Sequence, residues 1–178
     1  MSRSSSFPPI CPPNTRVLIL GSLPGTASLA AARYYAHPQN QFWRLTGAVI
    51  GQDLSALDYG ARLAALGSVG IGLWDAVASA QRAGSLDSAL REVEAAALGD
   101  LIATLPELRA IAFNGATAAR IGRQALGETS PVLLDLPSSS PAHAAMSFTD
   151  KAQRWKSLRE FLVAPCDDDK AMPVSAAP

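Results

Sequence analysis

Four short apolar runs, separated by longer stretches, are the feature that most restricts how this chain can fold. They cover residues 17–20, 69–73, 110–113 and 132–136. Gly, Pro, Asn or Asp stands at or just after the end of each run, and these residues are typical of the ends of strands. Runs of four or five apolar residues suit strands that are buried on both faces. The sequence therefore predicts four buried strands.

The stretches between these runs carry apolar residues at helical spacing. Helices are predicted over about 54–64, 86–97 and 155–162, where apolar side chains recur every three or four positions. Ser85 and Thr149 stand where helix N-caps belong, and each is followed within one turn by an Asp that suits the helix dipole.

Strands that alternate with helices predict right-handed crossovers and a mainly parallel sheet. The fold class we expect is α/β, a three-layer α/β/α sandwich around a central four-stranded, mainly parallel sheet. Residues 16–164 form the predicted domain. Residues 1–15 and 165–178 are rich in Pro, Ser and small residues, so we expect an irregular N-terminal segment and a mobile C-terminal tail.

Composition excludes several classes of protein. The 15 basic residues balance the 15 acidic ones, so any affinity for nucleic acid must come from a local patch. Two cysteines and two histidines, without metal-ligand spacing, predict no metal, no iron–sulfur cluster and no other cofactor. No apolar run has the length of a membrane span. We expect a monomeric cytoplasmic protein.

Ligands of parallel α/β sheets bind beyond the carboxyl ends of the strands, so the residues after each run are the candidate site. The loop Gly21–Gly25 follows the first run, but it lacks the Lys of a P-loop and is not a GxGxxG fingerprint. The segment 34–43, YYAHPQNQFW, then crowds aromatic and amide side chains around a proline turn. Core packing alone does not require that mixture.

Five motifs in this order resemble the uracil-DNA glycosylase superfamily. They are GSLPG (21–25), YAHPQNQFW (35–43), GLWD (72–75), FNG (113–115) and LPSSSPAH (136–143), and together with GSLDSAL (84–90) they look most like its hypoxanthine-DNA glycosylase branch. The resemblance covers about residues 16–162. It implies a monofunctional enzyme of base-excision repair that flips a deaminated base out of damaged DNA and hydrolyses its N-glycosidic bond.

The resemblance implies a base-binding pocket and a role for each motif. Tyr35 aligns with the aromatic residue that stacks on the flipped base, and Asp75 with the side chain that reads the base edge. The predicted base-binding residues are Gly21, Ser22, Leu23, Pro24, Tyr35 and Asp75. Both residues have a structural alternative: Tyr35 could be a packing residue, and Asp75 could cap the next segment.

Leu23 stands where uracil-specific relatives carry a water-activating Asp and mismatch-specific relatives an Asn. A leucine cannot orient water, so the task is assigned to Asn40, which could instead be a helix cap. Asn114 is a second catalytic candidate, although an Asn-Gly pair is often only a turn. Ser138 completes the catalytic set, because its hydroxyl can donate a hydrogen bond to the departing base.

The LPSSSPAH motif (136–143), called the second motif loop below with Gly21–Gly25 as the first, and nearby basic residues are the predicted DNA contacts. Its serines offer hydroxyls and backbone N–H groups to phosphates, and Ala142 with His143 occupies the place of the wedge that fills the vacated stack. The predicted DNA-binding residues are Ser139, Ser140, Pro141, Ala142 and His143, with Arg33, Lys151, Arg154 and Lys156 as further phosphate contacts.

The predicted substrate is deoxyinosine. The predicted partners are damaged DNA and downstream abasic-site repair enzymes. While bound to DNA, the protein is expected to be associated with the nucleoid. A uracil-specific or mismatch-specific glycosylase is the alternative within the superfamily. A nonenzymatic nucleotide-binding α/β protein is the alternative from another class, because fold alone does not determine function. A serine hydrolase is disfavoured, since the chain has no GxSxG motif.

Overall fold

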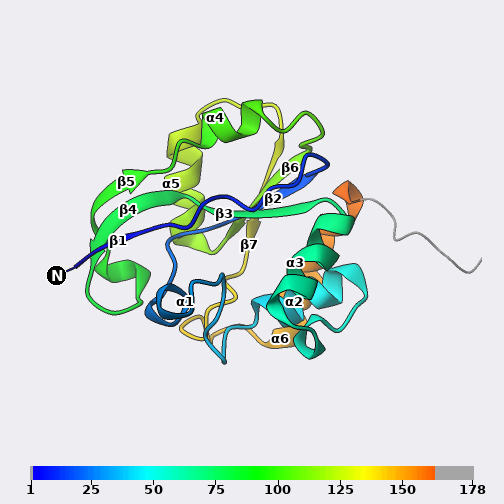
Figure 1. The fold of residues 1–178 in the computed structure, drawn as a ribbon, viewed down its shortest axis with the longest axis horizontal. Helices are drawn as coiled ribbons and strands as arrows, with labels where there is room; N and C mark the ends of the chain where they lie inside the picture. Colours follow the sequence, from blue (N-terminus) through cyan, green and yellow to red (C-terminus); the bar gives the residue numbers. More distant parts are fainter. Residues whose placement is uncertain (1, 163–178) are drawn as a thin grey trace, which may run out of the picture.

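The computed structural model describes residues 2–162 of the 178-residue chain. The predicted tail 165–178 and the last two residues of the predicted domain lie outside the described residues. In residues 2–162, a four-stranded parallel sheet occupies the centre of the molecule (Figure 1).

The four predicted strands are all present in that sheet. They are β2 (Val17–Gly21), β3 (Ile71–Asp75), β6 (Ala110–Asn114) and β7 (Val132–Leu136). Their order is β3-β2-β6-β7, and every neighbouring pair is parallel. The predicted fold class is therefore confirmed. The parallel arrangement brings the last residues of all four strands to one edge, where Gly21 pairs with Asp75 and Asn114 with Leu136.

Helices cover both faces of this sheet (Figure 1). On one face lie α4 (Leu98–Ala103) and α5 (Ala116–Leu126); on the other lie α2 (Phe42–Ile50), α3 (Tyr59–Ser68) and α6 (Phe148–Trp155). Successive strand residues point to opposite faces. Val17 and Ile19 accordingly pack with Trp155 in one core, while Leu18 and Leu20 pack in the other.

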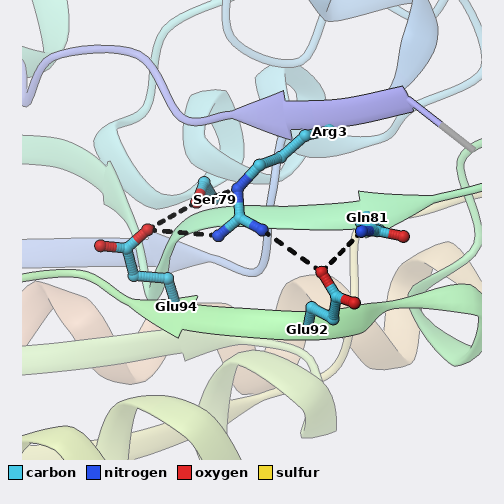
Figure 2. A network of polar contacts seen from close by, with 5 residues as sticks. All are labelled: Arg3, Ser79, Gln81, Glu92 and Glu94. Carbon is cyan, nitrogen blue, oxygen red and sulfur yellow. Dashed lines mark hydrogen bonds and ion pairs between the residues drawn. The ribbon is translucent and has the colours of Figure 1, made fainter.

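A second, antiparallel sheet was not foreseen from the sequence. It contains β1 (Ser2–Ser5), β4 (Val77–Arg82) and β5 (Arg91–Ala95) in the order β1-β4-β5. The prediction that residues 1–15 are irregular is thus wrong for residues 2–5. Figure 2 shows how Arg3 reaches across from β1 to Ser79 on β4 and to Glu92 and Glu94 on β5. This exposed network fastens the N-terminal strand to its neighbours.

The helix predicted over 86–97 is also wrong. A 3-10 turn at Asp87–Ala89 is followed by β5, whose side chains are all exposed. Because β5 is held by backbone pairing with β4, its side-chain pattern carried little information about its conformation. No α-helix begins after Ser85; its Oγ instead accepts a hydrogen bond from the Thr26 N–H at the start of α1 (Thr26–Ala31).

The remaining helix predictions were right in place but not in detail. The segment 54–64 divides into a 3-10 turn (Leu54–Ala56) and α3, because Asp53 and Asp58 each cap a new start. The segment 155–162 is the end of α6 and a 3-10 helix (Lys156–Phe161). The cap of α6 is Ser147 and not Thr149, since the Ser147 Oγ accepts from the Asp150 N–H at 3.1 Å.

Candidate active site

A cavity of about 640 Å³ opens at the edge of the sheet where the four parallel strands end. The predicted catalytic and base-binding residues and the predicted DNA-binding residues 139–143 all line it, whereas the further phosphate contacts Arg33, Lys151, Arg154 and Lys156 do not. The predicted residues that line the cavity are Gly21, Ser22, Leu23, Pro24, Tyr35, Asn40, Asp75, Asn114, Ser138, Ser139, Ser140, Pro141, Ala142 and His143. The structure thus brings together residues that are up to 122 positions apart in the chain (from 21 to 143). Their individual geometries differ from what the sequence suggested.

The first loop is held from behind by a buried arginine. Arg82, on β4, is 4 % exposed, and its guanidinium donates hydrogen bonds to the carbonyl oxygens of Leu23 (3.3 Å) and Pro24. The Leu23 side chain is 6 % exposed and packs in a small apolar cluster with Val77 and Ile121. Leu23 therefore shapes the wall of the cavity through packing, and the loop has little freedom to move.

Asp75 lies at the end of β3 and is 3 % exposed. Its Oδ2 accepts a 2.7 Å hydrogen bond from the Ser6 hydroxyl. Burial raises the pKa of the Asp75 carboxyl to about 7; the Ser6 hydrogen bond opposes this shift, Asp87 adds to it and Arg82 opposes it. No helix begins at Asp75, because β4 follows two residues later, so the alternative of a helix cap is excluded.

Gly21 leaves the space that the Asp75 carboxyl occupies next to the first loop. A Cβ atom at position 21 would lie 2.7 Å from Asp75 Oδ1 and 3.1 Å from the Tyr35 hydroxyl. Any larger residue would push these groups away from the floor of the cavity. Gly21 is therefore required here for close approach and not for an unusual backbone angle.

Tyr35 presents its ring to the cavity on a rigid aromatic support. Its ring stacks on Phe42 with 3.7 Å between centroids and 8° between planes, and meets Trp43 edge-on. The residue adopts a left-handed backbone conformation, with φ of 52°. Its hydroxyl is buried and has no hydrogen-bond partner among the described residues. Burial and the nearby Asp75 raise the pKa of this hydroxyl, so it stays a neutral donor.

Asn40 is engaged at the start of α2. Its Oδ1 accepts a 3.0 Å hydrogen bond from the Phe42 N–H. The N-cap of α2 is Gln41, and Asn40 supports the start of the helix from one residue before it, through this bond to the first helical N–H. An amide oxygen has a second lone pair, and Asn40 also lines the cavity, so the geometry permits both this bond and contact with a ligand or water.

Asn114 uses both ends of its amide to hold the second loop. Its Nδ2 donates to Ser139 Oγ at 2.9 Å, and its Oδ1 accepts from the Ser139 N–H at 2.8 Å. Ser139 is fully buried. The predicted contact between the Ser139 hydroxyl and DNA phosphate is therefore wrong, because that hydroxyl is enclosed and already bonded.

The rest of the second loop is turned toward the cavity and solvent. Ser138 Oγ accepts from the Ser140 N–H at 3.2 Å, which leaves the Ser138 proton free to be donated. Pro141 and Ala142 are exposed at the rim, and His143 is partly exposed.

Lys151 anchors this loop from α6. Its Nζ donates to the His143 carbonyl oxygen at 2.8 Å and to Gln41 Oε1 at 3.1 Å, and the residue is 2 % exposed. The prediction that Lys151 contacts phosphate is therefore wrong. Arg33, Arg154 and Lys156 are exposed and remain candidates.

Sequence reasoning missed several residues that build the site. Ser6 and Arg82 gave no signal, because they carry no motif and act from segments distant in sequence. Asp87 stood inside the GSLDSAL motif, and its Oδ1 accepts a 2.6 Å hydrogen bond from the Ser22 hydroxyl. Residues 2–162 contain no group of three potential metal ligands and no helix long and apolar enough to cross a membrane.

Comparison with known proteins defines the class to which this fold and site belong. The model of the uracil DNA glycosylase superfamily matches residues 8–161, and the chain belongs to that superfamily.

Within it, the chain is 40 % identical over 131 residues to a hypoxanthine DNA glycosylase of Methanosarcina barkeri, covering 74 % of this chain and 78 % of the relative. It is 37 % identical over 159 residues to a hypoxanthine DNA glycosylase of Methanosarcina acetivorans, covering 85 % and 95 %. A solution NMR structure of a candidate uracil DNA glycosylase from M. acetivorans matches with a TM-score of 0.81 at 35 % identity, over 90 % of this chain and 99 % of that one.

Proposed function

We propose that this protein is a DNA glycosylase that hydrolyses the N-glycosidic bond of deoxyinosine and releases hypoxanthine. The observation that carries the proposal is the make-up of the cavity: a buried carboxyl at its floor and a buried leucine in the first loop, where a water-activating acid would stand. The two relatives named hypoxanthine DNA glycosylase support the choice of base.

The flipped base enters the cavity and stacks on Tyr35. Stacking of a base on an aromatic ring contributes about 1–3 kcal/mol, and Phe42 keeps the Tyr35 ring from retreating. At the floor, Asp75 reads the edge of the base. Hypoxanthine presents an N1–H donor there, and a carboxylate oxygen accepts it.

Bond breaking passes through an oxocarbenium-like sugar, so it depends more on the departure of the base than on a strong nucleophile. The Ser138 hydroxyl is free to donate a hydrogen bond to the departing purine, and the purine then takes a proton from the attacking water. Asn40 holds the attacking water through the remaining lone pair of its Oδ1. Positioning of this kind lowers the barrier without a general base.

The enzyme is monofunctional in this proposal. Among the described residues no lysine lines the cavity, and Lys151 is buried and donates to the His143 carbonyl oxygen and to Gln41 Oε1. An amine that could attack the sugar carbon is therefore absent from the described cavity wall. The product is an abasic site in DNA, which later enzymes of base-excision repair process.

DNA binds across the rim through Ser140, Pro141, Ala142 and His143, with Ala142 and His143 filling the vacated stack. We propose that the protein acts as a monomer, without metal or cofactor, in the cytoplasm and on the nucleoid.

The direct test is a panel of labelled duplexes that contain inosine, uracil, xanthine or ethenocytosine. After incubation in chelator, alkali converts abasic sites into strand breaks. We expect inosine to be cut fastest. Faster cleavage of uracil would assign the protein to the uracil-specific or mismatch-specific type, and cleavage of none would leave a nucleotide-binding protein without glycosylase activity.

A further inference from the structure

The N-terminal segment that precedes the first core strand forms part of the wall behind the cavity. Its backbone pairs with β3 and β4: the Ser6 N–H donates to the Ala78 carbonyl at 2.8 Å, and Ile10 and Leu73 exchange two hydrogen bonds of 2.9 Å. The Trp74 indole N–H donates to the Phe7 carbonyl at 2.9 Å. These contacts involve residues on both sides of Asp75 in the chain, so they hold the N-terminal segment against the backbone around Asp75.

Ser6 is the residue of this segment that touches Asp75. Its Oγ lies 2.7 Å from Asp75 Oδ2 and 3.1 Å from the Phe7 carbonyl oxygen. A hydroxyl has one proton and two lone pairs, so two arrangements are possible. With ionised Asp75, Ser6 donates its proton to Oδ2; with protonated Asp75, Oδ2–H donates to Ser6, which then donates to Phe7.

The two carboxyl oxygens of Asp75 therefore differ. Oδ2 is turned to Ser6, whereas Oδ1 lies beside Gly21, which lines the cavity, and forms no hydrogen bond with any of the residues 2–162. In either arrangement a proton lies between Ser6 and Oδ2. Oδ1 is then an acceptor whether or not Asp75 is ionised.

We propose that Ser6 is a specificity-determining positioning residue, which holds the acidic proton of Asp75 away from the cavity so that Oδ1 faces the base as an acceptor only. This inference rests on the proposed function and refines it. Deamination of adenine replaces an N1 acceptor by an N1–H donor. An acceptor at Oδ1 binds hypoxanthine and repels adenine, whereas a proton on Oδ1 would allow adenine to bind.

The setting of Asp75 makes this control necessary. Its pKa, about 7, places both protonation states within the physiological range. The charged or titratable groups that act on it are Asp87 from the loop after β4, Arg82 from β4, and the neutral hydroxyls of Tyr34 and Tyr35. None of these residues forms a hydrogen bond with Oδ2, so among the described residues Ser6 alone distinguishes the two oxygens.

The experiment compares the full-length wild type with Ser6→Ala, Ser6→Thr and Ser5→Ala. Ser6→Thr retains the hydroxyl, and Ser5 is an exposed neighbour on β1 that serves as the matched control. Single-turnover cleavage of inosine and of adenine in the same duplex is measured from pH 5 to pH 9, with DNA affinity and thermal unfolding for each variant.

For Ser6→Ala we expect the ratio of inosine to adenine cleavage at pH 7 to fall at least tenfold. Inosine cleavage by Ser6→Ala should also fall as pH drops below the Asp75 pKa, a dependence that the wild type lacks, because the proton of the neutral carboxyl is no longer held on Oδ2. Ser6→Thr should restore both properties, and Ser5→Ala should match the wild type in both.

A Ser6→Ala variant that keeps the wild-type selectivity and pH profile overturns the inference while leaving the proposed function intact. A uniform loss of rate at every pH, with unchanged selectivity, also overturns it and reduces Ser6 to a structural residue. If the wild type itself cuts no inosine, the proposed function fails instead. If Ser6→Ala does not fold, the selectivity and the pH profile are measured on Ser6→Thr and Ser6→Cys instead. A thiol is a weak hydrogen-bond donor. Unchanged selectivity in Ser6→Cys therefore overturns the inference.

Discussion

The side chain of Asn114 forms two hydrogen bonds with Ser139, one to its Oγ and one from its backbone N–H, and Ser139 is fully buried. The pair joins the end of β6 to the second motif loop. A buried polar group that loses its partner costs about 1–3 kcal/mol. The Asn114 amide thus fixes the loop that carries Ser138, whatever it also contributes to chemistry.

For Asn114→Ala we therefore expect the free energy of unfolding to fall by about 1–3 kcal/mol, and single-turnover cleavage to fall at least tenfold because Ser138 loses its position. Urea denaturation and cleavage of an inosine duplex measure the two effects. Ser138→Ala is the comparison: it should lower the rate with little effect on stability. Equal stability of Asn114→Ala and the wild type would contradict the structural role.

Asn40→Ala should lower the cleavage rate by about a hundredfold, or some 3 kcal/mol, because one well-placed polar group in an active site commonly contributes that much. It should also cost about 1 kcal/mol of stability through the lost hydrogen bond to the Phe42 N–H. Asn40→Asp keeps an oxygen for that hydrogen bond and separates the two effects. If Asn40→Ala is destabilised but cleaves normally, its role is to support the start of α2 alone.

Stability should depend on pH through Asp75. Its pKa is raised from 3.8 to about 7 in the folded protein, so between about pH 4 and pH 7 the folded state binds more protons than the unfolded state. Stability due to this group therefore falls as pH rises through that window and is constant above it. Three pKa units correspond to up to about 4 kcal/mol.

The matched variant is Asp75→Asn, which is neutral at every pH. Urea denaturation at pH 4.5, 6 and 8 measures the free energy of unfolding of both proteins. The value for Asp75→Asn minus the value for the wild type should increase as pH rises, because only the wild type loses stability through Asp75. A constant difference between the two proteins would show that Asp75 has an ordinary pKa.

The two basic residues Lys151 and Arg154 should behave differently although they lie three positions apart on α6. Lys151→Met removes the hydrogen bonds to His143 and Gln41 and should destabilise the protein by about 1–3 kcal/mol. Arg154→Gln should leave stability unchanged and weaken DNA binding, with the slope of log affinity against log salt reduced by about 1.

Urea denaturation and fluorescence anisotropy with labelled duplex at 50–200 mM salt check both expectations. A salt slope unchanged in Arg154→Gln would remove Arg154 from the DNA interface. A stable Lys151→Met variant with weakened DNA binding would return Lys151 to the role that the sequence first suggested.

The sequence by itself determined the central sheet and the place of the site. Buried parallel strands are apolar on both faces, so the four runs were visible locally, and the carboxyl ends of parallel strands must meet at one edge. For this reason the sequence alone was enough to place Asp75, Asn114 and the two motif loops together.

Only the tertiary structure decided the conformation of β5, the burial of Ser139 and Lys151, and the contact of Ser6 with Asp75. The spacing of Leu90 and Val93 fitted a helix, but pairing with β4 made the segment a strand. Ser6 and Asp75 are 69 residues apart, and neither residue type indicates such a partner. Local periodicity reports which residues are apolar, whereas the partners of buried polar groups depend on which distant segments the fold packs against them.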